Sequence, residues 1–190
     1  MICLQTERLI IRDPIWADMD GHHLMLSDEL TLTYWPDIGS SSFEDNKSNL
    51  EAAISGAASL NREKYFFTME RRGTKEFVGT IGYTVSEWTP VGKIVGVGYA
   101  TSPNHRGQGY TLEALREIIR FAFEDNGVYR IYTGCLAENQ ASERVMQKCG
   151  MIKEAEFKHH TWHNGQMKDR VEYRMLKEDY DKIKNRDLTF

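Results

Sequence analysis

The sequence lacks any long uninterrupted hydrophobic run, and its first apolar stretch is broken by Glu7 and Arg8. A membrane-spanning helix needs about 20 apolar residues in succession, and a secretory signal needs an apolar block behind a basic start. Neither pattern is found in these residues. We therefore expect a protein that makes no use of a membrane and acts in the cytoplasm.

Clusters of basic residues are also missing. The 24 Lys and Arg residues are outnumbered by 28 Asp and Glu residues, and the formal net charge is -4. A basic stripe is the usual electrostatic footprint of a protein that binds nucleic acid or an anionic membrane. The composition therefore argues against both as partners.

Cysteine is scarce, and the three residues Cys3, Cys135 and Cys149 are scattered along the chain. Metal sites built on cysteine show short, paired spacings, and disulfide frameworks use an even number of cysteines. The odd, scattered set fits reduced thiols in a cytoplasm. The sequence predicts no metal site, and none of the three cysteines is favoured as a nucleophile.

Internal repeats and low-complexity segments are absent as well, and 41% of the 190 residues are hydrophobic. A chain of this length can bury one sizeable core. We expect one compact domain over residues 1–190.

A glycine-bearing turn at 104–109 is the most informative stretch that is present. It separates a strand-like run from a segment whose apolar residues step by three and four, as on one face of a helix. These apolar residues are Leu112, Leu115, Ile118, Ile119, Ala122 and Phe123. The first N–H groups of a helix lack internal partners and carry partial positive charge, so they suit an anion. Gly107 and Gly109 let the backbone approach a phosphate closely, and Arg106 adds a fixed positive charge.

Two familiar phosphate motifs do not fit this turn. A Walker loop requires a lysine after its last glycine, whereas Tyr110 and Thr111 follow Gly109. The dinucleotide fingerprint requires a third glycine where Leu112 stands. An ordinary strand-to-helix connection is the alternative to an anion site.

The N-terminal half of the chain predicts two helices and three strands that follow one opening strand. The opening strand carries Leu4, Leu9, Ile10 and Ile11 and is ended by Pro14, which cannot donate to a strand ladder. The loop-favouring Gly and Ser residues at 39–42 predict a loop over 31–42. The helices are expected over 16–26 and 46–60, and three adjacent antiparallel strands over 65–69, 77–83 and 94–101.

The C-terminal half predicts a crossover unit followed by a hairpin. A helix over 110–124 between strands 94–101 and 128–135 implies a parallel pair of strands. A further helix is expected over 139–149, with Asn139 as its N-cap. The last two strands, 152–162 and 167–175, are joined by Asn164-Gly165, a strong hairpin signal.

The helix at 139–149 carries Asn139-x-x-Ser142 at its start and Lys148-x-Gly150-Met151 at its end. Together with the glycine turn about thirty residues upstream, this pattern resembles the GNAT superfamily of N-acetyltransferases. Thr6-Glu7-Arg8-Leu9 is similar to the opening strand of the Rim-type branch, whose members acetylate protein N-termini or small amines. One departure is Asn104, where the family usually has Arg or Gln.

The resemblance implies an α/β (α+β) GNAT fold, with a mixed, mostly antiparallel, twisted sheet that is splayed at its centre and flanked by helices. It also implies acetyl-CoA as the cosubstrate. In the family, the asparagine contacts the pantetheine arm and the serine lies near the thioester sulfur, while a plain N-cap is the alternative role for Asn139. The expected contacts with acetyl-CoA are Tyr99, Ala100, Thr101, Arg106, Gly107, Gln108, Gly109, Tyr110, Thr111, Asn139 and Ser142.

The implied reaction is direct attack of a primary amine on the thioester carbonyl. A backbone N–H near Tyr99 to Ser102 would hold the carbonyl oxygen, as preorganised donors do where charge develops. Ser142 would be the catalytic residue that gives a proton to the departing thiolate. No tyrosine stands in the following part of the helix, where Val145 and Met146 are found.

The general base and the acceptor are less well defined by the sequence. The strand position that carries a glutamate in histone-type members falls near Lys93. A lysine substrate with a pKa near 10.4 is neutral in roughly one molecule in a few thousand at pH 7, whereas an α-amine with a pKa near 7.8 is neutral about a tenth of the time. We therefore expect an α-amino or other low-pKa acceptor, with a water relay through Glu87, Glu44 or a histidine.

Several alternatives remain open on sequence grounds. The acceptor is either a peptide N-terminus or a small molecule, and the segments expected to shape its pocket are 31–45 and 87–93, with Tyr34, Trp35 and Trp88 as aromatic walls. A CoA-binding sensor or interaction module with little catalysis is the rival function. His159, His160 and His163 are expected to be ordinary hairpin residues. A homodimer and a monomer are equally compatible with the sequence.

Overall fold

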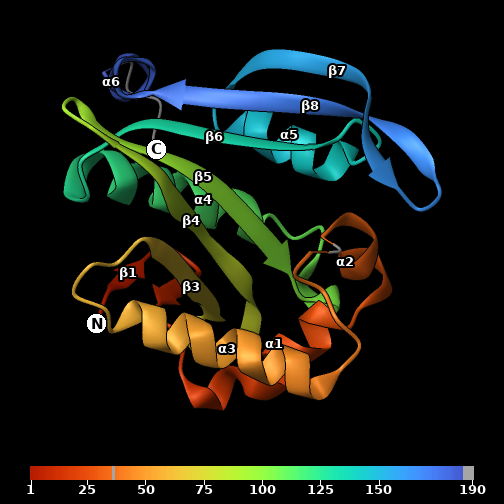
Figure 1. The fold of residues 1–190 in the computed structure, drawn as a ribbon. Coiled ribbons are helices and arrows are strands. Elements are labelled where there is room, and N and C mark those ends of the chain that lie inside the picture. The colour runs from red at the N-terminus through yellow and green to blue at the C-terminus, as the bar shows by residue number, and fades with distance from the viewer. Residues whose placement is uncertain (36, 186–190) are drawn as a thin grey trace. The chain divides into compact units, whose positions relative to one another are not determined.

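The computed structural model describes residues 1–35 and 37–185. Pro36 and residues 186–190, which the single-domain prediction also covered, lie outside the described part. The strands form a mixed sheet with the hydrogen-bonding order β1-β2-β3-β4-β5-β6-β8-β7 (Figure 1). The strands are β1 Cys3–Gln5, β2 Leu9–Arg12, β3 Lys64–Arg71, β4 Phe77–Thr89, β5 Gly92–Thr101, β6 Val128–Leu136, β7 Ile152–His163 and β8 Gln166–Leu176.

Helices flank the sheet and lie in the connections β2–β3, β5–β6 and β6–β7. The α-helices are α1 Met19–Leu26, α2 Glu29–Tyr34, α3 Phe43–Ala57, α4 Tyr110–Arg120, α5 Gln140–Lys148 and α6 Lys177–Lys184. Two 3-10 turns, η1 Trp16–Asp18 and η2 Pro103–His105, and one π-helical turn, η3 Phe121–Asp125, complete the described elements. Within the described residues, no helix is both long and apolar enough to cross a membrane.

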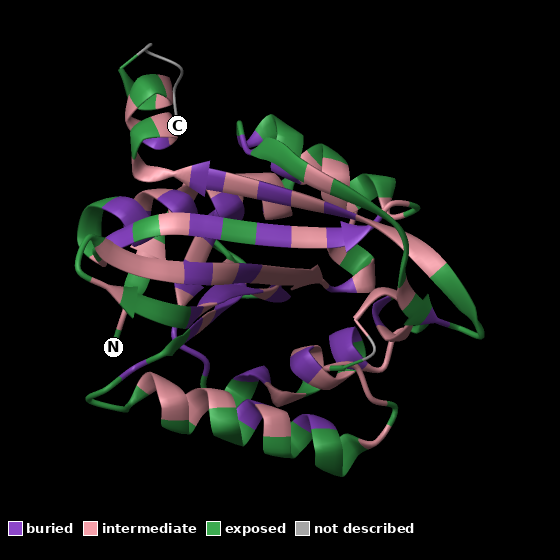
Figure 2. Cartoon of the chain, turned by 45° about the horizontal axis from the view of Figure 1, so that its top comes forward, coloured by how far each residue is buried: buried purple, intermediate pink, exposed green. Residues whose placement is uncertain are grey.

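The residues group into two compact units, and β4 and β5 each contribute to both. The first unit comprises residues 1–84 and 98–117, and the second comprises residues 85–97 and those from 118 onward. In the first unit, β1, β2, β3 and β4 pair antiparallel in sequence, with Leu9 opposite Arg71 and Phe67 opposite Ile81. Helix α3 packs on α1 and on β3, and it buries Asn46 and Leu50 while most of its other residues are exposed or half-buried (Figure 2).

The N-terminal run forms a hairpin, so the prediction of a single opening strand was wrong. The amide of Thr6 donates to the carbonyl of Leu9 over 3.0 Å and closes a turn between β1 and β2. The polar residues Thr6, Glu7 and Arg8 interrupt the apolar run at this turn. Leu9 and Ile11 then alternate into the core, each with no exposed surface.

The predicted helix over 16–26 is present as a 3-10 turn, η1, followed by α1 from Met19. Met25 and Leu26 are almost completely buried, whereas Trp16 and Leu24 are 50% and 47% exposed.

The prediction of a loop over 31–42 missed the short helix α2. Asp28 caps this helix, since its side chain accepts hydrogen bonds from the amides of Leu30 and Thr31. The following helix α3 begins three residues earlier than expected because Ser42 caps it through the amide of Asp45. Local capping residues, rather than the apolar pattern, thus set both starts.

In the second unit, the predicted crossover is confirmed. Strands β5 and β6 pair in parallel, and the described register runs from Lys93–Val128 to Gly96–Tyr132. Strand β6 continues to Leu136 and pairs antiparallel with β8 over its length. The hairpin between β7 and β8 is also as predicted, with positive φ angles of 47° at Asn164 and 80° at Gly165. Helix α6 was not anticipated from the sequence.

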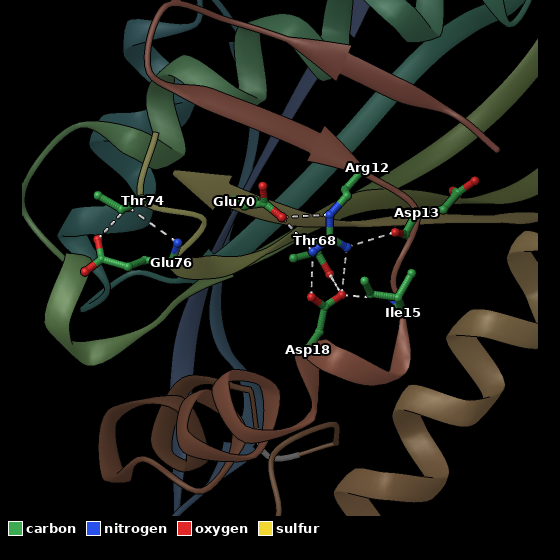
Figure 3. A network of polar contacts seen from close by, with 8 residues as sticks. All are labelled: Arg12, Asp13, Ile15, Asp18, Thr68, Glu70, Thr74 and Glu76. Carbon is green, nitrogen blue, oxygen red and sulfur yellow. Dashed lines mark hydrogen bonds and ion pairs between the residues drawn. The ribbon is translucent and has the colours of Figure 1, made fainter. Parts of the chain in front are cut away.

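A buried ionic network joins β2, β3 and the start of η1 (Figure 3). The guanidinium of Arg12 contacts both oxygens of Asp18 at 2.7 and 2.9 Å and Oε2 of Glu70 at 2.8 Å. Thr68 donates to Asp18 over 2.8 Å, and the side chain of Asp18 is only 5% exposed. Burial alone would raise the pKa of Asp18, but the hydrogen bonds from Arg12, Ile15 and Thr68 lower it below its ordinary value of 3.8.

We predict that Asp18→Asn destabilises the fold by about 3 kcal/mol, since removing one member of a buried ion pair leaves its partner poorly compensated. Urea unfolding at pH 7 measures the change. Glu76→Gln is the control, because Glu76 pairs with Arg71 at the exposed β3–β4 turn and surface pairs contribute little.

The pH dependence of the Asp18 contribution to stability has a defined sign. A lowered folded-state pKa contributes stability above pH 3.8 that is lost as the pH falls through the lower value. The difference between wild type and variant should therefore shrink only below pH 3.8; a constant difference down to pH 2 would contradict the assignment.

Candidate active site

The turn before α4 presents its backbone to solvent. Gly107 and Gly109 have φ angles of 72° and 81°, in the left-handed region that glycine adopts without a Cβ penalty. Residues 107 to 109 are exposed, and a Cβ placed on Gly107 would have no neighbour within 4 Å. Within the described part of the chain, no hydrogen bond is assigned to the amides of these three residues. The start of α4 therefore offers free N–H donors with space in front of them.

Helix α4 is fixed in place by the turn between β1 and β2. Glu113, in the first turn of α4, accepts hydrogen bonds from Thr6 Oγ1 at 2.5 Å, from the amide of Arg8 at 2.8 Å and from Arg8 Nε at 2.6 Å. Arg8 also donates to the carbonyl of Gln108 over 3.0 Å and lies 4.5 Å from the ring centre of Tyr110. Burial would raise the pKa of Glu113, but these hydrogen bonds lower it, so its carboxylate stays charged and paired with Arg8.

Sequence reasoning had not assigned a role to Glu113. The sequence feature that could have pointed to Glu113 is the Thr6-Glu7-Arg8-Leu9 segment, which resembles the family but had no physical explanation. The contacts supply that explanation, because the segment holds the first turn of α4 and the glycine turn in one arrangement.

The guanidinium of Arg106 is directed at α2. Its Nη2 contacts the carboxylate of Asp28 in a short ion pair and donates to Thr31 Oγ1 over 3.1 Å. Its Nε donates to the carbonyl of Thr101 over 3.2 Å. The positive charge that the sequence suggested for a phosphate is thus paired inside the protein, and the backbone amides are the donors that remain open at this turn.

The end of β5 carries three of the expected cosubstrate contacts, Tyr99, Ala100 and Thr101, and all are half-buried. Thr101 Oγ1 lies 2.6 Å from Thr111 Oγ1 in the first turn of α4, which joins the strand end to the helix start. The neighbouring strand approaches so closely that a Cβ on Gly79 would lie 2.3 Å from the carbonyl oxygen of Ala100. The first unit therefore brings residues 99–101 and 106–111 together on one structure.

In the second unit, Asn139 and Ser142 open α5. The side chain of Asn139 accepts from the amide of Ser142 over 3.1 Å, so the N-cap role expected for Asn139 is confirmed. The thiol of Cys135 donates to the carbonyl of Asn139 over 3.7 Å and also interacts with the Ser142 hydroxyl, at the carboxyl end of β6 and the start of α5. Burial raises the pKa of Cys135 to about 11, and the contact with Ser142 only partly offsets this effect.

Lys93 stands near the strand position that carries a glutamate in histone-type members, and the candidates for a base are Glu44, Glu87 and the histidines. Lys93 donates to Asn126 over 2.9 Å and lies 4.8 Å from the ring centre of Trp88, and burial lowers its pKa. Glu44 is exposed and lies 3.8 Å from Lys47, and Glu87 is exposed on β4. His159 and His160 are exposed, as expected for hairpin residues, whereas His163 is buried, contrary to that expectation.

Comparison with known proteins agrees with this arrangement. A family model described as an acetyltransferase (GNAT) domain matches residues 8–152. An uncharacterised N-acetyltransferase, YoaA of Bacillus subtilis, is 30% identical over 180 residues, which cover 92% of this chain and 96% of YoaA.

Solved structures of similar fold include a ribosomal-protein-S5-alanine acetyltransferase from Vibrio fischeri, with a TM-score of 0.79 at 20% identity, covering 95% of this chain and 99% of that one. A spermidine N-acetyltransferase from Vibrio cholerae, solved with CoA and spermine, has a TM-score of 0.78 at 18% identity and covers 92% and 99% of the two chains. The expected fold is confirmed, and the chain belongs to the GNAT family of N-acetyltransferases, which are acetyl-CoA-dependent acyltransferases.

Proposed function

We propose that the protein transfers the acetyl group of acetyl-CoA to an α-amine or another primary amine of low pKa. The observation that carries this proposal is the exposed turn of Gly107 to Gly109, whose free amides stand at the positive end of α4. Such a site holds a diphosphate without a bound metal, because several N–H donors share its charge. A reducing cytoplasm, in which the free thiols of the chain persist, is the proposed location.

The residues present fit acetyl-CoA. The amides of residues 106–111 would hold its diphosphate, and Asn139 would contact the pantetheine arm in addition to its capping role. A backbone N–H in 99–101 would hold the thioester carbonyl oxygen while negative charge develops there. Acetyl-CoA itself supplies the activated acyl group and a thiolate leaving group.

In the proposed reaction, the neutral amine attacks the thioester carbon, and the bond between carbon and sulfur then breaks. Ser142 gives a proton to the departing thiolate and regains one, through water, from the amine nitrogen, which loses its extra proton as the amide forms. We propose this role because Ser142 stands where the family places a serine near the thioester sulfur. General acid assistance of this kind typically contributes about 10²-fold or more to a rate.

We propose this acceptor class because the strand position that carries a glutamate in histone-type members of the family falls near Lys93, which is a poor general base. An enzyme without a strong base works best on amines that are already partly neutral, which favours α-amines over lysine side chains. Among proteins of similar fold, one is named for the alanine of ribosomal protein S5 and another for spermidine. A peptide N-terminus is the acceptor that we favour here, and a small amine is the alternative.

A CoA-binding sensor is a second candidate, favoured by one observation. Asn104 replaces the usual Arg or Gln, and its carbonyl accepts from Gln108 Nε2 over 3.1 Å. This position therefore adds no cation to the turn. A sensor would bind acetyl-CoA without transferring its acetyl group.

An amine panel tests the proposal. We expect CoA thiol release from acetyl-CoA only when an acceptor is added, with peptides of free N-terminus and small α-amines used at least about tenfold faster than N-blocked lysine peptides, in line with their neutral fractions. Faster use of lysine side chains would overturn the acceptor class. Binding of acetyl-CoA without transfer to any amine would favour the sensor.

The glycine turn can be tested by a matched pair of substitutions. Gly107→Ala and Gly127→Ala both place a side chain at positive φ, 72° and 63°, with nothing within 4 Å. Each should cost about 1–2 kcal/mol of stability. Only Gly107→Ala should raise the dissociation constant of acetyl-CoA, by about tenfold or ~1.4 kcal/mol, because Gly127 follows the other end of the same helical segment. Isothermal titration calorimetry measures the dissociation constant of acetyl-CoA for each variant. Equal dissociation constants for the two variants would exclude the turn as the phosphate site.

Ser142→Ala should lower kcat by roughly 10²-fold and leave the dissociation constant of acetyl-CoA nearly unchanged. Ser48→Ala, at an exposed position within α3, is the matched control. Steady-state kinetics with a good amine acceptor gives the comparison. Unchanged turnover would remove Ser142 from the mechanism.

A further inference from the structure

The carboxylate of Asp28 both caps helix α2 and forms an ion pair with Arg106, next to the glycine turn. Asp28 Oδ2 accepts the amides of Leu30 at 3.1 Å and Thr31 at 3.2 Å, and it also forms the ion pair with Arg106. Burial would raise the pKa of Asp28, but the Arg106 and amide hydrogen bonds lower it. The carboxylate is therefore charged at neutral pH, and it connects the start of α2 to the residue before Gly107.

The planar guanidinium of Arg106 matches this arrangement closely. Its Nε reaches the carbonyl of Thr101, and its Nη2 reaches Asp28 and Thr31, whose side chain is almost fully buried. Arginine presents these donors in a rigid fork, which lysine cannot reproduce. One side chain thus links the end of β5, the glycine turn and α2.

The other end of α2 rests on β5. Trp35 is the C-cap residue of the helix. A Cβ placed on Gly98 would lie 3.3 Å from Cζ2 of Trp35 and 3.6 Å from Cε1 of Phe66. Gly98 directly precedes residues 99–101, to which the proposed function assigns the thioester carbonyl. Helix α2 therefore runs from the proposed diphosphate site to the proposed reacting end of acetyl-CoA.

We propose that Asp28 and Arg106 form a positioning pair that fixes α2, and with it Trp35, as a wall for the amine acceptor. This inference rests on the proposed function. Neither residue touches the reacting atoms in it. The pair acts through α2, so its loss weakens acceptor binding while the diphosphate stays bound by the backbone amides.

The alternative is that Arg106 is a phosphate ligand whose charge is paired with Asp28 until acetyl-CoA binds. The two hypotheses predict different effects of removing Asp28 on the affinity for acetyl-CoA. If the charge of Arg106 served the phosphate, removing the competing carboxylate of Asp28 would tighten acetyl-CoA binding. If the pair positions α2, removing Asp28 changes the acceptor step and not the binding of acetyl-CoA.

The experiment compares Asp28→Ser, Arg106→Gln and Arg106→Lys with wild type. Serine retains N-capping ability, so Asp28→Ser removes mainly the charge. Misplacement of a substrate-positioning element by about 1 Å can cost up to ~10²-fold, and we expect all three variants to raise the KM of the acceptor about tenfold. The dissociation constant of acetyl-CoA should change by less than about twofold, because these substitutions change side chains and leave the backbone amides of the turn in place. Arg71→Gln, at the exposed β3–β4 turn, is the control and should change neither constant.

Two outcomes overturn the inference. In one, Asp28→Ser binds acetyl-CoA more tightly and Arg106→Gln more weakly than wild type. In the other, the acceptor KM is unchanged in all variants. Failure of the proposed function is recognised separately, because wild type itself then transfers no acetyl group. In that case, hydrogen exchange at the amides of Leu32 and Trp35 still tests whether the pair fixes α2, because both amides form hydrogen bonds within this helix. Loss of protection in both Asp28→Ser and Arg106→Gln supports the pair, and unchanged protection refutes it.

Discussion

The left-handed backbone at Gly107 and Gly109 is the constraint on which the site depends. It lets the chain turn sharply after β5 and enter α4 with its first amides directed at solvent. Contacts from two elements hold the first turn of α4: Thr6 and Arg8 on Glu113, and Thr101 on Thr111. The start of α4 is thereby supported from the β1–β2 turn and from β5.

The charged side chains around the turn are paired with one another. Glu113 would repel a diphosphate if its charge were uncompensated, and Arg8 neutralises it. Arg106 is likewise neutralised by Asp28. What remains is a set of backbone dipoles at the N-terminus of a helix, which attract an anion without a strongly charged competitor. This arrangement explains why Asn104, a departure from the family pattern, does not remove the basis for binding.

The sequence was informative where local chemistry decides the structure. The glycine turn, the start of α5 at Asn139 and the Asn164-Gly165 hairpin are determined by the conformations that these residues favour, and each was predicted correctly. The parallel pair of β5 and β6 was predicted from the strand–helix–strand order along the sequence. Thr6-Glu7-Arg8 was treated as part of one strand because its turn depends on Glu113, more than 100 residues away. Helix α2 was missed because a six-residue helix has too few apolar repeats to be recognised, and its start depends on Asp28.

The thiol next to Ser142 has a consequence for the order of events in acetyl transfer. With a pKa of about 11, Cys135 is almost entirely protonated at neutral pH, and it is buried against α5. A protonated sulfur is a poor nucleophile, so Cys135 is poorly suited to carry the acetyl group between donor and acceptor. In the proposed reaction this favours a ternary complex of donor and amine over a ping-pong cycle through an acyl-cysteine at Cys135.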